Sequence, residues 1–274
     1  MKILKILIHI ILILLLTAIT QVGGVVYIIS LVIKISLIKK IRLNRKLFFC
    51  GIFTVVYFFF SILIVPPIAK SYGREALPVF SNKNLKPLNI MTCVLNRHYV
   101  RPELKQNIKS VAKKMSKKYP NTILSYLDAN FPFYNGFPLL PHLSHNDGKK
   151  LDVAFFYKNK LGDELNRKAP SFMGYGVFEE PKHGEYNAPK NCENKGFWQY
   201  SILDKFVPQW NKDDMVFDSN RTKSMIQLML KEKSTGKIFI EPHLKTRMNL
   251  QNNKIRFHGC RAVRHDDHVH LQIN

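Results

Sequence analysis

Two long apolar runs near the N-terminus constrain this chain more than any other feature of its sequence. Residues 6–33 are apolar apart from His9, a few hydroxyl and amide side chains and a glycine pair, and 47–65 carry no charge before Pro66-Pro67. As a helix, the first run would measure about 42 Å, which exceeds the bilayer core of about 30 Å and requires tilt or a frayed end. The sequence therefore predicts two transmembrane helices, at 6–33 and 47–65, and a membrane as partner.

A basic segment joins the two runs and predicts the orientation of the chain. Lys34 to Lys46 contains six lysine or arginine residues, and residues 1–69 carry eight basic and no acidic side chains. Short basic loops stay in the cytoplasm. We therefore expect an inner (cytoplasmic) membrane protein whose N-terminus and C-terminal domain lie on the periplasmic or extracytoplasmic side. The alternative for residues 1–20 is a cleaved signal peptide.

The rest of the chain is long enough for one domain with a well-formed core. Residues 1–69 form the predicted anchor, 70–90 a predicted tether and 91–274 the predicted domain. The whole chain has a net charge of +23 and the anchor contributes eight basic side chains, so the remainder carries +15. A basic surface suggests an anionic neighbour such as lipid head groups or cell-wall polymer. The charges are dispersed and we find no nucleic-acid motif, so no nucleic-acid partner is expected.

The last ten residues predict a strand with histidines on one face. Side chains alternate between the two faces of a strand, so His268 and His270 share one face and the apolar residues next to them share the other. The two imidazoles then lie about 7 Å apart along the backbone. Imidazole binds metals and titrates near neutral pH, so this pattern indicates chemistry rather than packing.

A second histidine-rich segment lies in the middle of the chain. His142 and His145 precede a turn at Gly148, which leads into an apolar strand that contains Asp152. A carboxylate inside an apolar strand is costly to bury unless it is paired or binds a metal. His145, Asp152 and one histidine of the final strand would supply two imidazoles and a carboxylate. That set is typical of a catalytic zinc site whose fourth position is open for water.

The remaining pattern predicts an α+β domain with a small antiparallel sheet, which carries the zinc site and is flanked by helices. Apolar residues recur at helical spacing in 102–118 and in 220–233. Strands are expected at 122–127, 151–157 and 237–241, and a short helix at 242–250. Residues 161–215 are irregular and rich in glycine, proline and aromatic residues, which is typical of a substrate-binding wall or of ordinary packing.

Four cysteines leave the disulfide pairing open. Cys50 lies in an apolar run, whereas Cys93, Cys192 and Cys260 lie in the predicted soluble part, so at most one disulfide forms there. Three pairings are possible. Cys260 lies five residues before His265, and a disulfide or a buried thiol is favoured there over a metal ligand.

The histidine and aspartate spacings resemble those of a known family. The elements that carry the resemblance are His142-x-x-His145-x-x-Gly148-x-x-x-Asp152, a helix, Ile238-Phe239-Ile240-Glu241-Pro242 and His265-x-x-His268-x-His270. In order and spacing they are similar to penicillin-insensitive murein endopeptidases. More broadly, they resemble the zinc peptidases that group D-alanyl-D-alanine peptidases with hedgehog-like domains. The resemblance covers residues 88–274.

The resemblance implies a function and assigns roles to the site residues. It implies a Zn²⁺ cofactor bound by His145, Asp152 and His270, and general-base work or transition-state stabilisation by His268. His142 and His265 match further active-site histidines of the family. The implied activity is that of a zinc metallopeptidase that hydrolyses peptide cross-links of peptidoglycan, with peptide stems as partners. The two predicted spans would anchor it in the membrane.

Two alternatives to this activity stay open. One is a non-catalytic zinc domain that binds the cell wall or a partner protein, and the other is a D-alanyl-D-alanine carboxypeptidase. For either peptidase, the substrate bears carboxylates. The candidate side chains to bind them are Arg247, Arg256, Arg261 and Arg264.

Overall fold

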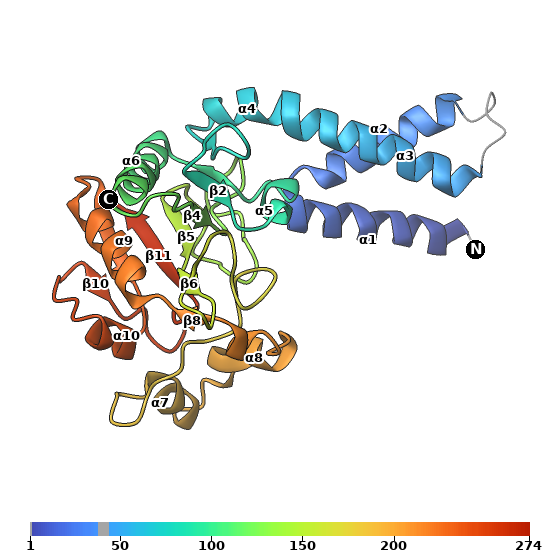
Figure 1. Ribbon diagram of the computed structural model, residues 1–274. Helices are drawn as coiled ribbons and strands as arrows, with labels where there is room; N and C mark the ends of the chain where they lie inside the picture. The colour runs from blue at the N-terminus through green and yellow to red at the C-terminus, as the bar shows by residue number, and fades with distance from the viewer. Residues whose placement is uncertain (1, 38–43) are drawn as a thin grey trace.

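The computed structural model describes residues 2–37 and 44–274 and has the predicted mixed α+β character. A group of N-terminal helices projects from a folded domain that contains all the strands (Figure 1). Of the predicted basic loop, residues 38–43 lie outside the described residues.

The first apolar run forms two helices instead of the single helix predicted at 6–33. Helix α1 spans Lys2–Thr20 and runs toward the folded domain, and α2 spans Gly23–Leu37 and runs away from it (Figure 1). The chain reverses because Gln21 adopts a left-handed conformation, with φ of 65°. A side chain at Gly24 would lie 2.1 Å from Thr17 Oγ1, so only glycine permits this close packing of α2 on α1.

The second apolar run extends past the predicted end at residue 65. Helix α3 spans Arg45–Phe59, continues through a π-helical turn at Phe60–Ile64 (η2) and ends with α4, Val65–Ser71. The two prolines lie in the first turn of α4, directly after the π-helical turn, and the chain stays helical through them although proline has no N–H to donate. Two helical stretches, Lys2–Thr20 and Arg45–Ser71, are therefore long and apolar enough to span a membrane. Helix α2 has 15 residues, about 22 Å, and is too short to do so alone.

Five basic residues of the anchor that the structure describes gather at the end remote from the domain. Lys2 and Lys5 are at the start of α1, Lys34 is in the last turn of α2, and Arg45 and Lys46 begin α3. In Figure 1 these three helix ends lie at the same end of the anchor. The N-terminus therefore lies at the opposite end of the anchor from the domain, which differs from the predicted arrangement.

The domain is built on a six-stranded sheet in the order β10-β9-β11-β5-β4-β2. The strands span Ile255–Arg256, Thr235–Phe239, His268–Ile273, Lys150–Ala154, Leu124–Tyr126 and Leu85–Pro87, respectively. The four central strands are antiparallel, whereas each edge strand pairs in parallel with its neighbour. The prediction of one small antiparallel sheet was therefore too simple.

Two smaller sheets and several short helices complete the domain. Strand β1 (Glu75–Ala76) pairs with β3 (Tyr99–Val100), and β6 (Tyr157–Lys158) lies between β7 (Glu164–Leu165) and β8 (Val216–Phe217). The short helices are α5 (Ile90–Val94), α7 (Ala188–Asn194), α8 (Ile202–Phe206), α10 (Pro242–Arg247) and the 3₁₀ turns η3 (Trp198–Ser201) and η4 (Lys212–Asp214).

Two amphipathic helices cover one face of the main sheet, as the periodicity predicts. Helices α6 (Pro102–Lys118) and α9 (Ser219–Lys231) bury their apolar faces in the same core as Val269, Leu271 and Ile273 of β11. Each fully buried aliphatic side chain contributes about 1.5–3 kcal/mol. The helices occupy the apolar face of β11, so His268 and His270 point to the opposite face.

The segment predicted as a tether is part of the folded domain. It contains β1 and β2, and β2 is an edge strand of the main sheet. Arg74 is buried and donates hydrogen bonds to the carbonyl oxygens of Phe131 and Asn146 and to Asn135 Oδ1. The anchor also contacts the domain directly, because Tyr57 Oη donates to the carbonyl of Val94 at 2.6 Å. The anchor is therefore packed against the domain instead of being joined to it by a flexible linker.

Acid should destabilise the domain through His98, which is buried beside β3. Burial, with a smaller effect of Lys105, lowers the pKa of His98 from 6.5 to about 4. The folded pKa lies below the unfolded value, so the contribution to stability is complete above pH 6.5 and is lost as the pH falls toward 4. Relative to the wild type, His98→Gln should therefore gain about 3 kcal/mol between pH 7 and pH 4. Chemical unfolding at several pH values measures this, and the exposed His183→Gln should show no such trend.

Candidate metal centre

The pairing of two central strands brings His270 and Asp152 together. Strands β11 and β5 are antiparallel, with His270 opposite Asp152 and His268 opposite Ala154. Side chains of directly paired residues lie on the same face of a sheet. Both residues are buried, at 2% and 0% exposure, on the face that the helices leave free.

His145 reaches the same point from the loop before β5. Its Nδ1 lies 2.6 Å from the carbonyl oxygen of Ala129, so Nδ1–H donates there and leaves Nε2 free to bind a metal. Gly148 adopts a left-handed conformation, with φ of 82°, where the chain turns into β5. His145 Nε2 lies 3.2 Å from Asp152 Oδ1 and 3.1 Å from His270 Nδ1.

The spacing of the three ligand atoms suits a tetrahedral zinc ion. His270 Nδ1 lies 3.0 Å from Asp152 Oδ1, so all three atoms are within 3.2 Å of one another. Zinc bonds of about 2.0–2.1 Å at tetrahedral angles hold neighbouring ligands about 3.3 Å apart. Among the described residues, Asp152 Oδ1 accepts no well-aligned hydrogen bond although it is fully buried. Such an orphaned carboxylate oxygen between imidazole nitrogens fits a bound cation.

Asp152 is ionised in this setting. Burial acts to raise its pKa, but the adjacent His145, His268 and His142 outweigh burial and hold the pKa well below its usual range. Tyr175 Oη donates a hydrogen bond to Asp152 Oδ2 at 2.9 Å. An ionised carboxylate with one oxygen fixed by a hydrogen bond is a well-oriented metal ligand.

His142 also lies within reach of a metal at this site. Its Nδ1 lies 3.0 Å from Asp152 Oδ2, and ligand atoms of His142, His145 and Asp152 lie within 4.8 Å of one another. This buried group could therefore bind a metal ion. The set with His270 is tighter and meets at one carboxylate oxygen, so the geometry favours His270 over His142 as the candidate for the third ligand.

His268 is held beside the three ligands by a second carboxylate. Its Nδ1 contacts Asp267 Oδ1, and Asp267 Oδ2 accepts a hydrogen bond from Gly176 N–H at 2.7 Å. Its Nε2 faces Asp152 Oδ1 at 3.5 Å. Burial lowers the pKa of His268, but Asp152 and Asp267 outweigh burial and raise it to about 9. A divalent ion in the site would oppose this increase because it repels an imidazolium.

His265 lies next to His268 and His270. The ring centroids are 5.0 Å and 5.5 Å away, respectively. Burial, together with His268 and His270, holds the pKa of His265 well below its usual range, so the imidazole is neutral. The six residues predicted for the site, His142, His145, Asp152, His265, His268 and His270, therefore all lie at one place.

Three further residues of the site were missed in the sequence. Tyr175 contacts Asp152 from the irregular segment, Asp128 Oδ2 lies 3.6 Å from His142 Nδ1, and the His258 ring lies 5.3 Å from that of His265. Tyr175 has no sequence signal, because its position depends on how the irregular segment folds. His258 carried a weak signal, since it lies seven residues before His265, but a lone histidine is more often structural.

A cavity of about 480 Å³ opens onto the site. His142, His145, Asp152, His265 and His270 line one wall, and Tyr200, Leu203 and Arg261 line others.

The four candidate arginines differ in whether they line the cavity and in whether they are paired with an acidic residue. Arg247 pairs with Glu185, and Arg264 pairs with Asp266 and Glu180. Arg256 does not line the cavity. Arg261 lines it, is exposed, and has no hydrogen bond or ion pair within the described part of the chain.

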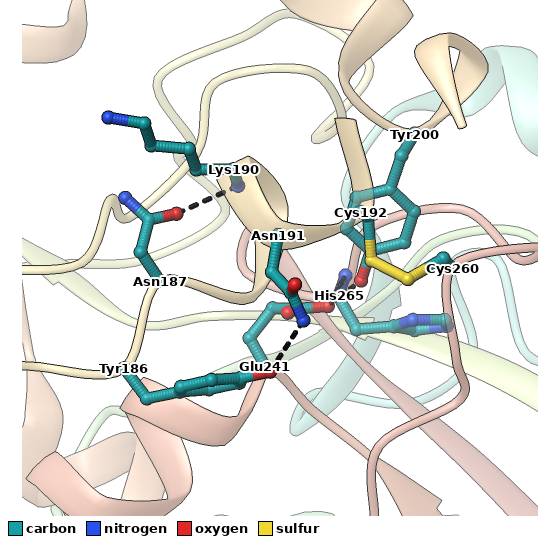
Figure 2. Close-up of a disulfide and its surroundings, with 9 residues drawn as sticks. All are labelled: Tyr186, Asn187, Lys190, Asn191, Cys192, Tyr200, Glu241, Cys260 and His265. Atoms are coloured by element: carbon teal, nitrogen blue, oxygen red, sulfur yellow. Dashed lines mark hydrogen bonds between the residues drawn. A yellow bond between two sulfur atoms is a disulfide. The ribbon is translucent and has the colours of Figure 1, made fainter. Parts of the chain in front are cut away.

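One disulfide fixes the wall of the cavity. Cys192 of α7 is bonded to Cys260, next to Arg261, which links the irregular segment to the loop before His265. Figure 2 shows this bond close to Tyr200, Glu241 and His265. Cys260 is thus not a metal ligand, and Cys93 is the buried free thiol.

Loss of the disulfide should destabilise the domain strongly. The bonded cysteines are 68 residues apart, and closing such a loop stabilises the folded state by about 4 kcal/mol. Cys192→Ser/Cys260→Ser should lower the free energy of unfolding by that amount. Denaturant unfolding followed by tryptophan fluorescence measures it, with Cys50→Ser as control. Equal stability of the double variant and the wild type would contradict the expectation.

No family model matches this chain, and no curated protein matches it.

Proposed function

We propose that the protein is a membrane-anchored zinc peptidase that hydrolyses peptide cross-links of peptidoglycan. The observation that carries the proposal is the convergence of His145, Asp152 and His270 within 3.2 Å, with His268 beside them, at the wall of a cavity. The resemblance of the motifs to murein endopeptidases supports the choice of substrate.

His145, Asp152 and His270 would hold the ion, and the other histidines would handle protons. When bound, zinc lowers the pKa of a water molecule toward about 7 and polarises a carbonyl. His268 is oriented by Asp267 through Nδ1, so its Nε2 can accept a proton from water and return it to the leaving amine. His142 and the neutral His265 flank His268 and can donate hydrogen bonds to a developing oxyanion.

Two observations support an extracytoplasmic domain at the inner membrane. A disulfide joins Cys192 and Cys260, and such bonds persist in oxidising compartments. The basic ends of α1, α2 and α3 gather at the end of the anchor remote from the domain, where the positive-inside rule expects the cytoplasm. The N-terminus would then be cytoplasmic.

Arg261 is our candidate for binding a carboxylate of the peptide stem. It is exposed in the cavity of the site, and its guanidinium has no partner within the described residues. Arg261→Ala should raise KM about 10-fold and change kcat little, because a charge-assisted hydrogen bond to an unreacting group is lost. Arg256→Ala, outside the cavity, is the control, and an unchanged KM in Arg261→Ala would refute the assignment.

Hydrolysis of a defined substrate tests the proposed function. The full chain in detergent is incubated with synthetic cross-linked stem peptides that lack glycan, with and without a zinc chelator. We expect cleavage at the cross-link, its loss on chelation and its recovery with added zinc. Product mass separates an endopeptidase from a carboxypeptidase, which releases a terminal alanine. Cleavage that is insensitive to chelation, or absence of cleavage with zinc bound, would exclude the proposal.

A further inference from the structure

A second cavity lies next to that of the metal centre and has a different lining. Its volume is about 600 Å³. Tyr175 lines it and also donates a hydrogen bond to Asp152 at 2.9 Å. Helix α8 separates the two cavities, because Leu203 lines the first and Phe206 lines the second. Tyr175 therefore links the lining of this cavity to Asp152, which lines the first.

Three aromatic rings meet at this cavity and are largely exposed. Phe172, Phe206 and Trp210 line it and are 76%, 77% and 79% exposed, respectively. Large exposed aromatic side chains gathered around a hollow mark a binding surface, because water solvates their faces poorly. The segments that carry them are tied together, since Gln209 Nε2 donates to the carbonyl of Gly176 at 2.8 Å.

The charge and polarity of the lining residues indicate which class of ligand this cavity would bind. Arg167 and Lys168 lie at the cavity and are exposed, and no acidic side chain is among its described lining residues. Asn211 adds an amide that can donate and accept hydrogen bonds. Flat aromatic faces, an amide and two cations match a chain of N-acetylated sugar rings. The C–H faces of such rings pack on aromatic rings, their acetamido groups hydrogen-bond to an amide, and the carboxylates of rings that carry no stem peptide pair with cations.

We propose that this second cavity binds the glycan chain of the polymer whose peptides are cleaved at the metal centre. The ligand class is an acidic, N-acetylated oligosaccharide. The inference rests on the proposed function for the identity of the polymer. A glycan strand held beyond Tyr175 and α8 would present its peptide stem to the neighbouring metal centre.

Binding of peptide-free glycan tests the inference without involving catalysis. The full chain in detergent, with chelator present, is titrated by calorimetry with soluble peptidoglycan oligosaccharides from which the peptides have been removed. We expect saturable binding, and a Kd at least 10-fold higher for Phe172→Ala/Trp210→Ala. The matched control is Phe80→Ala/Trp198→Ala, which removes two exposed rings, 83% and 69%, that do not line this cavity. Lys168→Ala should raise Kd about 3-fold.

The outcomes separate this inference from the proposed function. Absence of glycan binding, an equal Kd for the two double variants, or displacement of the glycan by free stem peptides would overturn the inference. Glycan binding by a protein that fails to cleave cross-linked peptides would support the glycan site and exclude the peptidase activity. Cleavage of glycan-free peptides without glycan binding would support the peptidase activity and exclude the glycan site.

Discussion

Replacing His268 with alanine is expected to slow hydrolysis of cross-linked stem peptides by about 10²- to 10⁴-fold, the usual contribution of a general base. The metal should remain bound, because His268 is not among the three closest ligand atoms. Its Nε2 lies 3.5 Å from Asp152 Oδ1, whereas the ligand nitrogens of His145 and His270 lie at 3.2 and 3.0 Å. The loss should therefore appear in kcat at unchanged zinc content.

Two companion variants make this result specific. Asp267→Asn removes the charge that orients His268 and should produce a smaller loss of kcat in the same direction. The exposed His183→Ala should be fully active. Full activity of His268→Ala would show that another group moves the proton, and loss of zinc from it would show that His268 is a ligand.

The second large effect is expected at Asp152. Asp152→Asn removes the buried negative charge that four imidazoles surround and replaces a candidate carboxylate ligand with a neutral amide. We expect zinc affinity to fall more than the 10- to 100-fold that is typical of a supporting residue around a metal site. Activity at limiting zinc should be lost, and saturating zinc should restore it only in part. Competition with a chromophoric chelator measures the affinity.

Asp163→Asn is the matched control for Asp152, because Asp163 is an exposed aspartate in a loop. Its zinc affinity should equal that of the wild type. An Asp152→Asn protein that binds zinc as tightly as the wild type would contradict the assigned ligand set.

The sequence predicted that the candidate ligands converge, because strand geometry is local. Side chains of a strand alternate between its two faces, so His268 and His270 were predicted to share one face. Strand β11 has that arrangement, with its apolar residues toward α6 and α9. The spacing from His145 to Asp152 around Gly148 also suffices to bring both side chains to one point. Helix α6 was predicted to the residue and α9 to within two residues, because helical periodicity is also local.

Features that depend on contacts distant in the sequence could not be predicted in this way. The reversal at Gln21 depends on the packing of Gly24 against Thr17, which hydropathy does not report. The segment 70–90 was predicted to be a tether, yet Arg74 in it donates to backbone carbonyls of Phe131 and Asn146. Cysteine count left the pairing of Cys192 with Cys260 open, and Tyr175 reaches Asp152 only through the fold of the irregular segment.

The zinc content of three proteins purified without added metal tests the central claim most directly. We expect one zinc ion per chain in the wild type and in His142→Ala, and almost none in His270→Ala, because His270 Nδ1 lies within 3.1 Å of both other ligand atoms. Zinc that is retained in His270→Ala and lost in His142→Ala would contradict the assignment, and a wild-type chain that binds no zinc would contradict the entire account.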